Sequence, residues 1–277
     1  MHSLLHTRET LGTLRFRPNQ IEVVLSDRFY THPDQEIREQ ITQAWGSYYQ
    51  ERSSTRIIED LNNYRLDGIE RGGEGGFITL HLSRVKYSQK RGFGVLAKDH
   101  PELLTNSENC PRGIGIGGII RTSDGKFIMI SKRGGKTDAH NPLSIVSGIP
   151  TSEDAIQLKS GPQIAAYVAM EIKQEIGVPP ECIQEVLLAD LVFTDSGSVM
   201  IITETELSIT AEEVLEGFGM HTDTDEITGI RILQSIEELE QALREIGGYH
   251  ARMADLYIAR LGREGEAPTD HPRLPIL

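Results

Sequence analysis

One amphipathic stretch, residues 163–178, constrains this chain more than any other segment, and it reads QIAAYVAMEIKQEIGV. Its apolar residues recur at helical spacing along one stripe, at Ile164, Val168, Ile172 and Ile176. The adjacent stripe carries Glu171 and Glu175 four residues apart, so two carboxylates share one face of the helix. Like charges at this spacing repel each other, and a divalent cation bound between them would relieve the repulsion. The alternative is a pair of solvated glutamates on an exposed helix face.

The composition favours a water-soluble protein with small partners. With 277 residues the chain can form one large domain or two small ones, and its formal net charge is −13. That charge repels nucleic acids and anionic membranes, so we expect cations and small molecules as partners. The first residues lack an apolar core of signal-peptide length, and no apolar run is long enough to cross a membrane. The two cysteines, Cys110 and Cys182, lack C-x-x-C spacing, which favours a reducing, cytoplasmic location.

The first hundred residues show a β-α-β pattern of their own. Strands are expected at residues 20–26 and 77–84. The helix between them carries Trp45 on its apolar face. The polar, glycine-broken residues 87–94 suggest a surface loop, where Tyr87 would either pack or stack on a nucleotide base. We therefore divide the chain into an N-terminal extension, residues 1–108, and a second domain, residues 109–277.

Strand and turn signals alternate in the second domain. Strands are expected at residues 115–121 and 127–131, and within residues 186–194 and 198–209. The glycines around the first of these lead into a strand and a hairpin, so they do not form a dinucleotide-binding loop, which opens a helix. Lys132 and Arg133 follow the second strand, where they would meet a phosphate or stay solvated. An acidic loop containing Glu226 precedes a further short strand, and helices are expected over residues 235–246 and 249–261.

This order of elements resembles the Nudix hydrolase superfamily, whose box reads G-x5-E-x7-R-E-U-x-E-E-x-G-U with U a bulky apolar residue. The residues that match its second half are Glu171, Ile172, Glu175, Gly177 and Val178. Met170 stands at the arginine position, Gln174 at the first glutamate of the pair, and an insertion separates Gly148 from the helix. The family's arginine pairs with an upstream glutamate that also lacks a clear equivalent here, and losing both partners of a buried ion pair can cost little.

Within the superfamily, the chain resembles the animal-type UDP-glucose diphosphatase branch, which also has an interrupted box and an N-terminal extension. The similar blocks are REQITQAW, NNYRLDGI, LHLSRVKYS, TSDGK, NPLSIVSG, MEIKQEIGV, DEITGI and the tail from LYIARL to LPIL. This resemblance implies an α+β fold of the α/β/α sandwich type, in which a mixed sheet packs on the box helix. It also implies the N-terminal β-α-β extension.

The resemblance further implies a Mg²⁺-dependent site, with Mn²⁺ as an alternative metal. The residues that it assigns are Glu171, Glu175 and the Ser147 carbonyl for the metal, Glu171, Glu175 and the general base Glu226 for catalysis, and Lys132, Arg133 and Tyr87 for the substrate. The expected reaction converts UDP-glucose or UDP-galactose to UMP and a sugar 1-phosphate. Two alternatives stay open: a Nudix hydrolase acting on ADP-ribose or another nucleoside diphosphate derivative, and a catalytically silent nucleotide-binding module. The protein would be a monomer or a homodimer without nucleic-acid or membrane partners.

Overall fold

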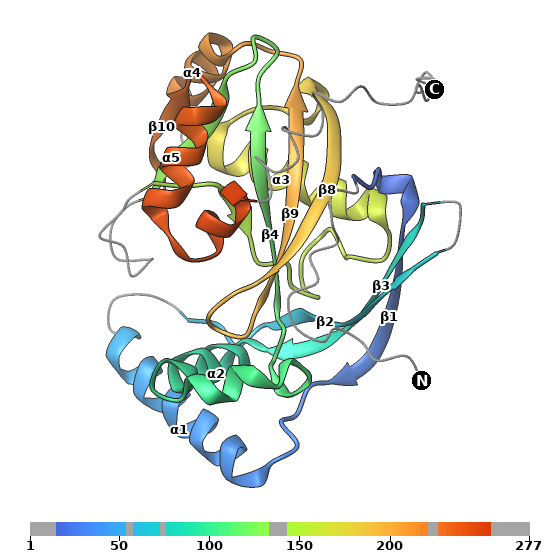
Figure 1. The fold of residues 1–277 in the computed structure, drawn as a ribbon, viewed down its shortest axis with the longest axis vertical. Coiled ribbons are helices and arrows are strands. Elements are labelled where there is room, and N and C mark those ends of the chain that lie inside the picture. The colour runs from blue at the N-terminus through green and yellow to red at the C-terminus, as the bar shows by residue number, and fades with distance from the viewer. Residues whose placement is uncertain (1–14, 54–57, 73–75, 133–142, 221–226, 256–277) are drawn as a thin grey trace.

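In the part of the chain that the structure describes, the N-terminal residues form a three-stranded sheet with two helices beside it (Figure 1). The computed structural model describes residues 15–53, 58–72, 76–132, 143–220 and 227–255. The sheet contains β1 (Ile21–Phe29), β2 (Asn62–Arg71) and β3 (Ile78–Lys86), with β3 in the middle. β1 and β3 run parallel, and helix α1 (Gln35–Arg52) connects β1 to the rest of the sheet. The strands and the helix expected in this region are therefore confirmed.

Residues 87–94 belong to a helix, α2 (Tyr87–Asp99), so the expectation of a surface loop was wrong. The glycines that suggested a loop lie instead where α2 packs on its neighbours. A Cβ atom at Gly92 would come within 2.4 Å of the Ile41 backbone oxygen on α1, so only glycine allows this close approach. Tertiary packing has thus overridden the low helix propensity of glycine.

Sequence patterning also does not identify β2 as a strand. Four consecutive residues of β2 are buried, and Asn63 and Arg65 are among them. Both faces of residues 63–66 are covered, and the outer edge of β2 pairs with the second part of the chain through bridges from Asn63 to Thr151 and from Arg65 to Gly113. A strand buried on both faces by distant segments shows no alternation of apolar and polar residues.

The second part of the chain forms a mixed sheet that contains seven strands within the described residues. They are β4 (Ile114–Arg121), β5 (Phe127–Lys132), β6 (Leu143–Ser144), β7 (Val146–Gly148), β8 (Ile183–Phe193), β9 (Val199–Leu207) and β10 (Ile227–Leu233). The main order is β10-β5-β4-β9-β8, while β6 pairs with β5 and β7 pairs with β4. β4 and β9 are parallel, and the other pairs are antiparallel. The expected hairpin at Gly125 is confirmed, the strands β8 and β9 form a second hairpin, and the turns place Gly125 and Gly197 at positive φ.

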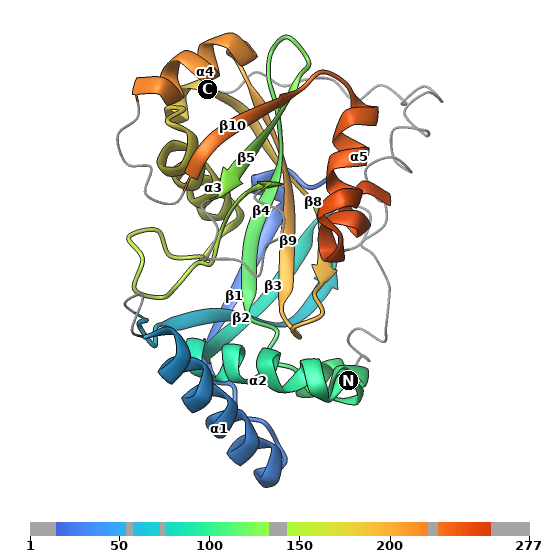
Figure 2. The ribbon, with the colours of Figure 1, turned by 90° about the vertical axis from the view of Figure 1, so that its left-hand side faces the viewer.

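Helices cover both faces of this sheet (Figure 2). Helices α3 (Gly161–Ile176) and α4 (Ala211–Met220) contribute to the core on one face, and α5 (Ile236–Ile246) contributes to the core on the other. Residues 248–255 form a further helical segment whose Met253 and Ala254 are buried beside α5. The arrangement is the α+β fold that we expected, with a mixed sheet between helical layers.

The central helix α3 has the expected apolar stripe, since Ile164, Val168, Ile172 and Ile176 are all buried in the core. It ends at Gly177, which adopts a left-handed conformation with φ of 74°. Helix α5 begins after the expected cap, because the Ser235 side chain accepts a hydrogen bond from the Glu238 N–H. Short 3-10 helices lie at Pro18–Gln20, Pro101–Thr105, Ser107–Asn109 and Pro180–Cys182. None of the helices in the described ranges combines the length and apolar character needed to cross a membrane.

Candidate functional site

Glu175 is the centre of a buried polar contact that joins three elements. It projects from α3, and only 9% of its surface is exposed. The Lys132 ammonium at the end of β5 donates to Glu175 Oε1 at 2.9 Å, and the Ser147 backbone N–H of β7 donates to Oε2 at 3.1 Å. Burial raises the pKa of Glu175, although the contacts with Lys132 and Ser147 oppose this rise. Glu175 is therefore not a solvated glutamate on an exposed helix face.

Glu171 lies one turn earlier on the same face of α3, beside Tyr167 and Gly148. Burial raises the pKa of Glu171, and repulsion from Glu175 acts in the same direction, while a hydrogen bond from the Tyr167 hydroxyl opposes both effects. A Cβ atom at Gly148 would lie 2.2 Å from Glu171 Oε1 and 2.5 Å from the Tyr167 hydroxyl. Because Gly148 has no side chain, the Glu171 carboxylate and the Tyr167 hydroxyl have room beside it.

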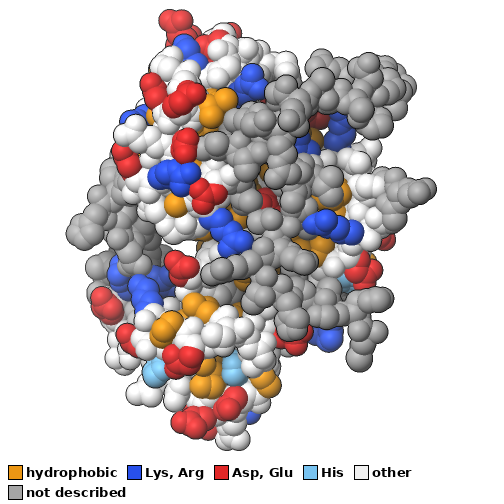
Figure 3. Space-filling view, in the orientation of Figure 1, with side chains coloured by type: hydrophobic (Ala, Val, Ile, Leu, Met, Phe, Trp, Pro, Cys, Tyr) orange, Lys and Arg blue, Asp and Glu red, His pale blue; other side chains and the backbone are white. Residues whose placement is uncertain are grey.

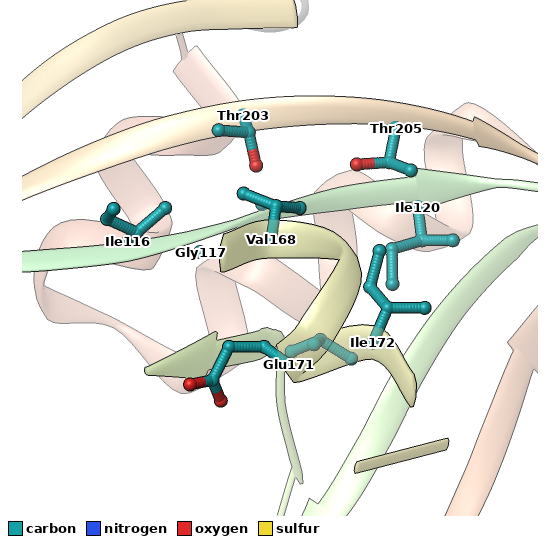
Figure 4. A pocket seen from close by; sticks show the side chains of 10 residues that line it. Ile116, Gly117, Ile120, Val168, Glu171, Ile172, Thr203 and Thr205 are labelled. Atoms are coloured by element: carbon teal, nitrogen blue, oxygen red, sulfur yellow. The ribbon is translucent and has the colours of Figure 1, made fainter. Parts of the chain in front are cut away.

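A small cavity of about 10 Å³ lies between α3 and the strands β4 and β9, with Glu171 at its edge (Figure 4). Figure 4 shows the Glu171 carboxylate turned away from Thr203 and Thr205. The Thr203 hydroxyl is buried and has no hydrogen-bond partner in the described structure. The cavity has room for about one water molecule, which is too little for a substrate. This cavity is therefore not a substrate-binding pocket.

The insertion that interrupts the Nudix-like box is held by the N-terminal sheet. The Asn62 side-chain amide donates to Glu153 Oε1 at 2.6 Å, and the Ser152 N–H donates to the Asn62 carbonyl at 2.8 Å. The Leu158 N–H donates to the Tyr64 hydroxyl at 3.2 Å. β2 therefore fixes the segment that leads into α3.

This fixed insertion places a third carboxylate near the glutamate pair. Asp154 accepts hydrogen bonds from the Thr151 N–H at 2.6 Å and from the Thr151 hydroxyl at 2.8 Å. Its charge contributes to the raised pKa values of Glu171 and Tyr167. No cluster of three or more His, Cys, Asp or Glu side chains within the described ranges could hold a metal together. Asp154 thus adds negative potential to the site without joining such a cluster.

Tyr249 and His250 also lie near the site, although sequence reasoning did not select them. The charge of Glu175 adds to the effect of burial in raising the pKa of Tyr249. Burial lowers the pKa of His250 to about 4, and the charge of Lys132 acts in the same direction. The only local signal is the pair of glycines at 247 and 248, both at positive φ, which end α5 and turn the chain back. The long-range approach to Lys132 and Glu175 has no signature in the sequence.

Of the remaining residues that we selected from the sequence, Tyr87 belongs to a different group of side chains. The Tyr87 ring packs edge-on against Trp45, with 5.8 Å between the ring centroids, as the packing alternative for this residue requires. Contact of Tyr87 with a nucleotide stays a prediction. Arg133 and Glu226 lie outside the described residues. Ser147 contacts Glu175 through its N–H, and the use of its carbonyl as a metal ligand stays a prediction as well.

Several solved structures with a similar arrangement are Nudix proteins. A Nudix hydrolase from Nitrosomonas europaea is 12% identical, with 53% of this chain and 88% of that chain covered and a TM-score of 0.34. The Nudix domain of Shewanella oneidensis NrtR, in complex with ADP ribose, is 11% identical over 53% of this chain and 87% of that chain, with a TM-score of 0.37. RenU, a Nudix hydrolase from M. smegmatis, is 11% identical over 57% of this chain and 88% of that chain, with a TM-score of 0.32.

Sequence comparison adds no relative to these structures. No family model matches the chain, and no curated protein sequence matches it. At such low identities and TM-scores, the structural likenesses do not assign an activity to this chain. Its function has to be inferred from the site itself.

Proposed function

We propose that this chain is a divalent-metal-dependent hydrolase that cleaves the diphosphate bond of a nucleoside diphosphate derivative. The observation that supports this most is the pair Glu171 and Glu175, two carboxylates on one helix face whose pKa values are both raised by burial. Burying neighbouring negative charges costs free energy unless a cation compensates for them. Lys132 already supplies one positive charge at 2.9 Å from Glu175. A second positive charge, from a metal ion, would compensate for Glu171.

The donor atoms at this site fit Mg²⁺. Magnesium prefers oxygen ligands and keeps several of its water molecules, so two carboxylates and one further oxygen are enough. Glu171 and Glu175 would hold the ion, and the Ser147 carbonyl is our proposed third ligand. Mn²⁺ accepts the same oxygen ligands. When bound, such an ion would neutralise charge on the diphosphate and lower the pKa of a water molecule.

The chain's own residues would position the reacting groups. The Ser147 N–H and the Tyr167 hydroxyl hold the two carboxylates in place, through hydrogen bonds to Glu175 and Glu171 respectively. Lys132 would attract a phosphate oxygen, and this role is supported by its ammonium, which lies 2.9 Å from Glu175 Oε1. The proposed roles of Arg133, Glu226 and Tyr87, in phosphate binding, proton abstraction and base contact, rest on the sequence resemblance.

UDP-glucose or UDP-galactose is the substrate that we favour, with UMP and a sugar 1-phosphate as products. This choice rests on the ordered series of sequence blocks shared with the UDP-glucose diphosphatase branch. ADP-ribose is the second candidate, because the similar NrtR Nudix domain was solved in complex with ADP ribose. A silent binding module is less well supported, since Gln174 is exposed on α3 and its replacement of a glutamate leaves Glu171 and Glu175 in place.

Release of UMP from UDP-glucose, compared with release of AMP from ADP-ribose at the same Mg²⁺ concentration, tests the proposal. Glu175→Gln removes a charge with little change in volume, and it should lower kcat by about 100-fold or more while the protein stays folded. Glu212→Gln, an exposed position on α4, is the matched control and should leave kcat unchanged. Mg²⁺-dependent turnover at a near-normal rate in the Glu175 variant would exclude this helix as the metal site.

A further inference from the structure

Arg112 is the one non-glycine residue with a positive φ, of 46°, in the ranges that the structure describes. Left-handed backbone is strained for a residue with a Cβ atom, whereas glycine adopts it freely. The Arg112 N–H donates to the Gly197 carbonyl at 2.9 Å, and the Leu66 N–H donates to the Arg112 carbonyl at 3.0 Å. Glycine would make both backbone contacts without strain, so an arginine at this position indicates a use of the side chain.

The Arg112 side chain is buried without a counter-charge. Only 4% of the residue is exposed, and its Nε and Nη1 atoms have no hydrogen-bond partner among the described residues. Burial lowers the pKa of Arg112 to about 10, which still leaves the guanidinium charged at pH 7. A buried charge with unused N–H donors costs free energy, and a bound anion would remove that cost.

A second buried guanidinium, that of Arg65, lies beside the same segment. Arg65 is 9% exposed, and its Nη2 donates to the Cys110 carbonyl, two residues before Arg112, at 3.4 Å. Its Nη1 pairs with Asp67, so this carboxylate balances the charge of Arg65 and leaves that of Arg112 over. The side chains of Arg65 and Asp67 are 11% and 15% exposed, so this arginine group (Arg65, Asp67 and Arg112) lies just below the surface.

The arginine group is separate from the proposed metal site. Gly113, which follows Arg112, bridges to Arg65, whereas Gly117 of β4 pairs with Ser147 beside Glu175. Four residues of extended chain separate the two glycines and span about 13 Å. The near-complete burial of both arginines favours a ligand of the size of phosphate over a nucleotide.

We propose that the arginine group binds a phosphate-sized oxyanion, with Arg112 as the main donor. Guanidinium groups form charge-assisted hydrogen bonds with such anions, and these are stronger than hydrogen bonds between neutral groups. Because the Arg112 backbone is bonded both to β2 and to the turn between β8 and β9, the anion would stabilise the junction of the two sheets. The site requires no metal, so this inference goes beyond the proposed function and can fail independently of it.

Thermal unfolding of the full-length protein in inorganic phosphate tests this site, with NaCl at equal ionic strength as the reference. Phosphate at ten times its dissociation constant should raise the melting temperature by about 3 to 6 °C. Arg112→Met removes the charge at similar side-chain length and should abolish this rise. Without phosphate, the variant should melt at or above the wild-type temperature, because an uncompensated buried charge has been removed. A lower melting temperature without phosphate would show a structural arginine and overturn the inference.

Two further variants distinguish the arginine group from other cationic positions. Figure 3 shows acidic and basic side chains interspersed on one face of the molecule, and the formal net charge is −13, so non-specific attraction of phosphate should be weak. Arg121→Met, an exposed position at the other end of β4, should keep the phosphate effect. Lys132→Met should keep it as well. Loss of the effect in Lys132→Met but not in Arg112→Met would place the anion at the proposed active site and overturn the inference.

UMP distinguishes a small anion from the phosphate group of a nucleotide. In the Lys132→Met variant, inorganic phosphate should raise the melting temperature and UMP should not. If UMP alone raised it, the ligand class would be wrong and the inference would be overturned.

A second measurement does not depend on the stability of a variant. In protein labelled with ¹⁵N-arginine, saturating phosphate should shift the Nε resonance of Arg112, which Arg112→Lys identifies by its absence from the spectrum. Unchanged arginine Nε resonances in the wild type would also overturn the inference.

Discussion

Replacement of Gly148, the last residue of β7, by alanine tests whether this position shapes the proposed metal site. The added Cβ atom would lie 2.2 Å from Glu171 Oε1 and 2.5 Å from the Tyr167 hydroxyl. Ordinary contact begins at about 3.4 Å, so the carboxylate would have to move by roughly 1 Å, and a displacement of that size can cost on the order of 100-fold in rate. The crowding should also lower the free energy of unfolding by about 1 to 3 kcal/mol.

The assay combines thermal unfolding, Mn²⁺ affinity and kcat/KM for the best nucleotide substrate. Gly148→Ala should lower all three, with the largest loss in kcat/KM. Gly217→Ala on α4 is the matched control, because nothing lies within 4 Å of its added Cβ. That control should raise stability by up to about 1 kcal/mol and leave metal affinity unchanged. If Gly148→Ala kept metal affinity and activity within twofold, Glu171 would not be held at this turn as the structure indicates.

Three further predictions concern the contacts around the site. Asn62→Ala removes the hydrogen bond from the Asn62 side-chain amide to Glu153, so it should lower the unfolding free energy by about 1 to 2 kcal/mol and weaken Mn²⁺ binding. The exposed control Gln43→Ala should do neither. Equal metal affinity in both variants would contradict the role of β2. Gly92→Ala should lower the melting temperature because its Cβ would meet the Ile41 oxygen at 2.4 Å, while Gly46→Ala on α1, which meets nothing within 4 Å, should raise it. The folded-state pKa of His250, about 4, lies below its ordinary value of 6.5. As the pH falls from 6.5 toward 4, the unfolded state therefore takes up a proton that the folded state does not. The free energy of unfolding is unaffected by this group above pH 6.5 and decreases over that range by up to about 3 kcal/mol. Denaturant titrations of wild type and His250→Gln across this range should show the steeper loss in the wild type, and parallel curves would contradict it.

Local patterning was sufficient for the elements whose signals lie within a few residues of one another. The apolar stripe of α3 follows from 3.6-residue periodicity, and the turn at Gly125 follows from the need for positive φ in a hairpin. The cap at Ser235 is also local, since its side chain bonds to an N–H three residues later. The pair Glu171 and Glu175 belongs to this class, because helical spacing alone places both on one face.

Tertiary structure decided the conformation of the segments in which glycine or polar residues contradict the local expectation. Gly92 reads as a helix breaker, yet it lies inside α2 because α1 approaches too closely for any side chain. β2 reads as irregular, yet it is a strand because β3 pairs with one of its edges and distant segments at Thr151 and Gly113 pair with the other. In each case the energy that decides the structure comes from a partner far away in the sequence, so no local pattern records it.

The site divides in the same way. The sequence alone determined that two carboxylates would share one helical face, but it could not determine that Glu175 would be buried or that Lys132 would bond to it. The approach of His250 to Lys132 was decided only by folding, because the two residues lie on elements more than a hundred positions apart. Spacing along one helix is fixed by backbone geometry, whereas burial and charge pairing arise only when separate elements pack together.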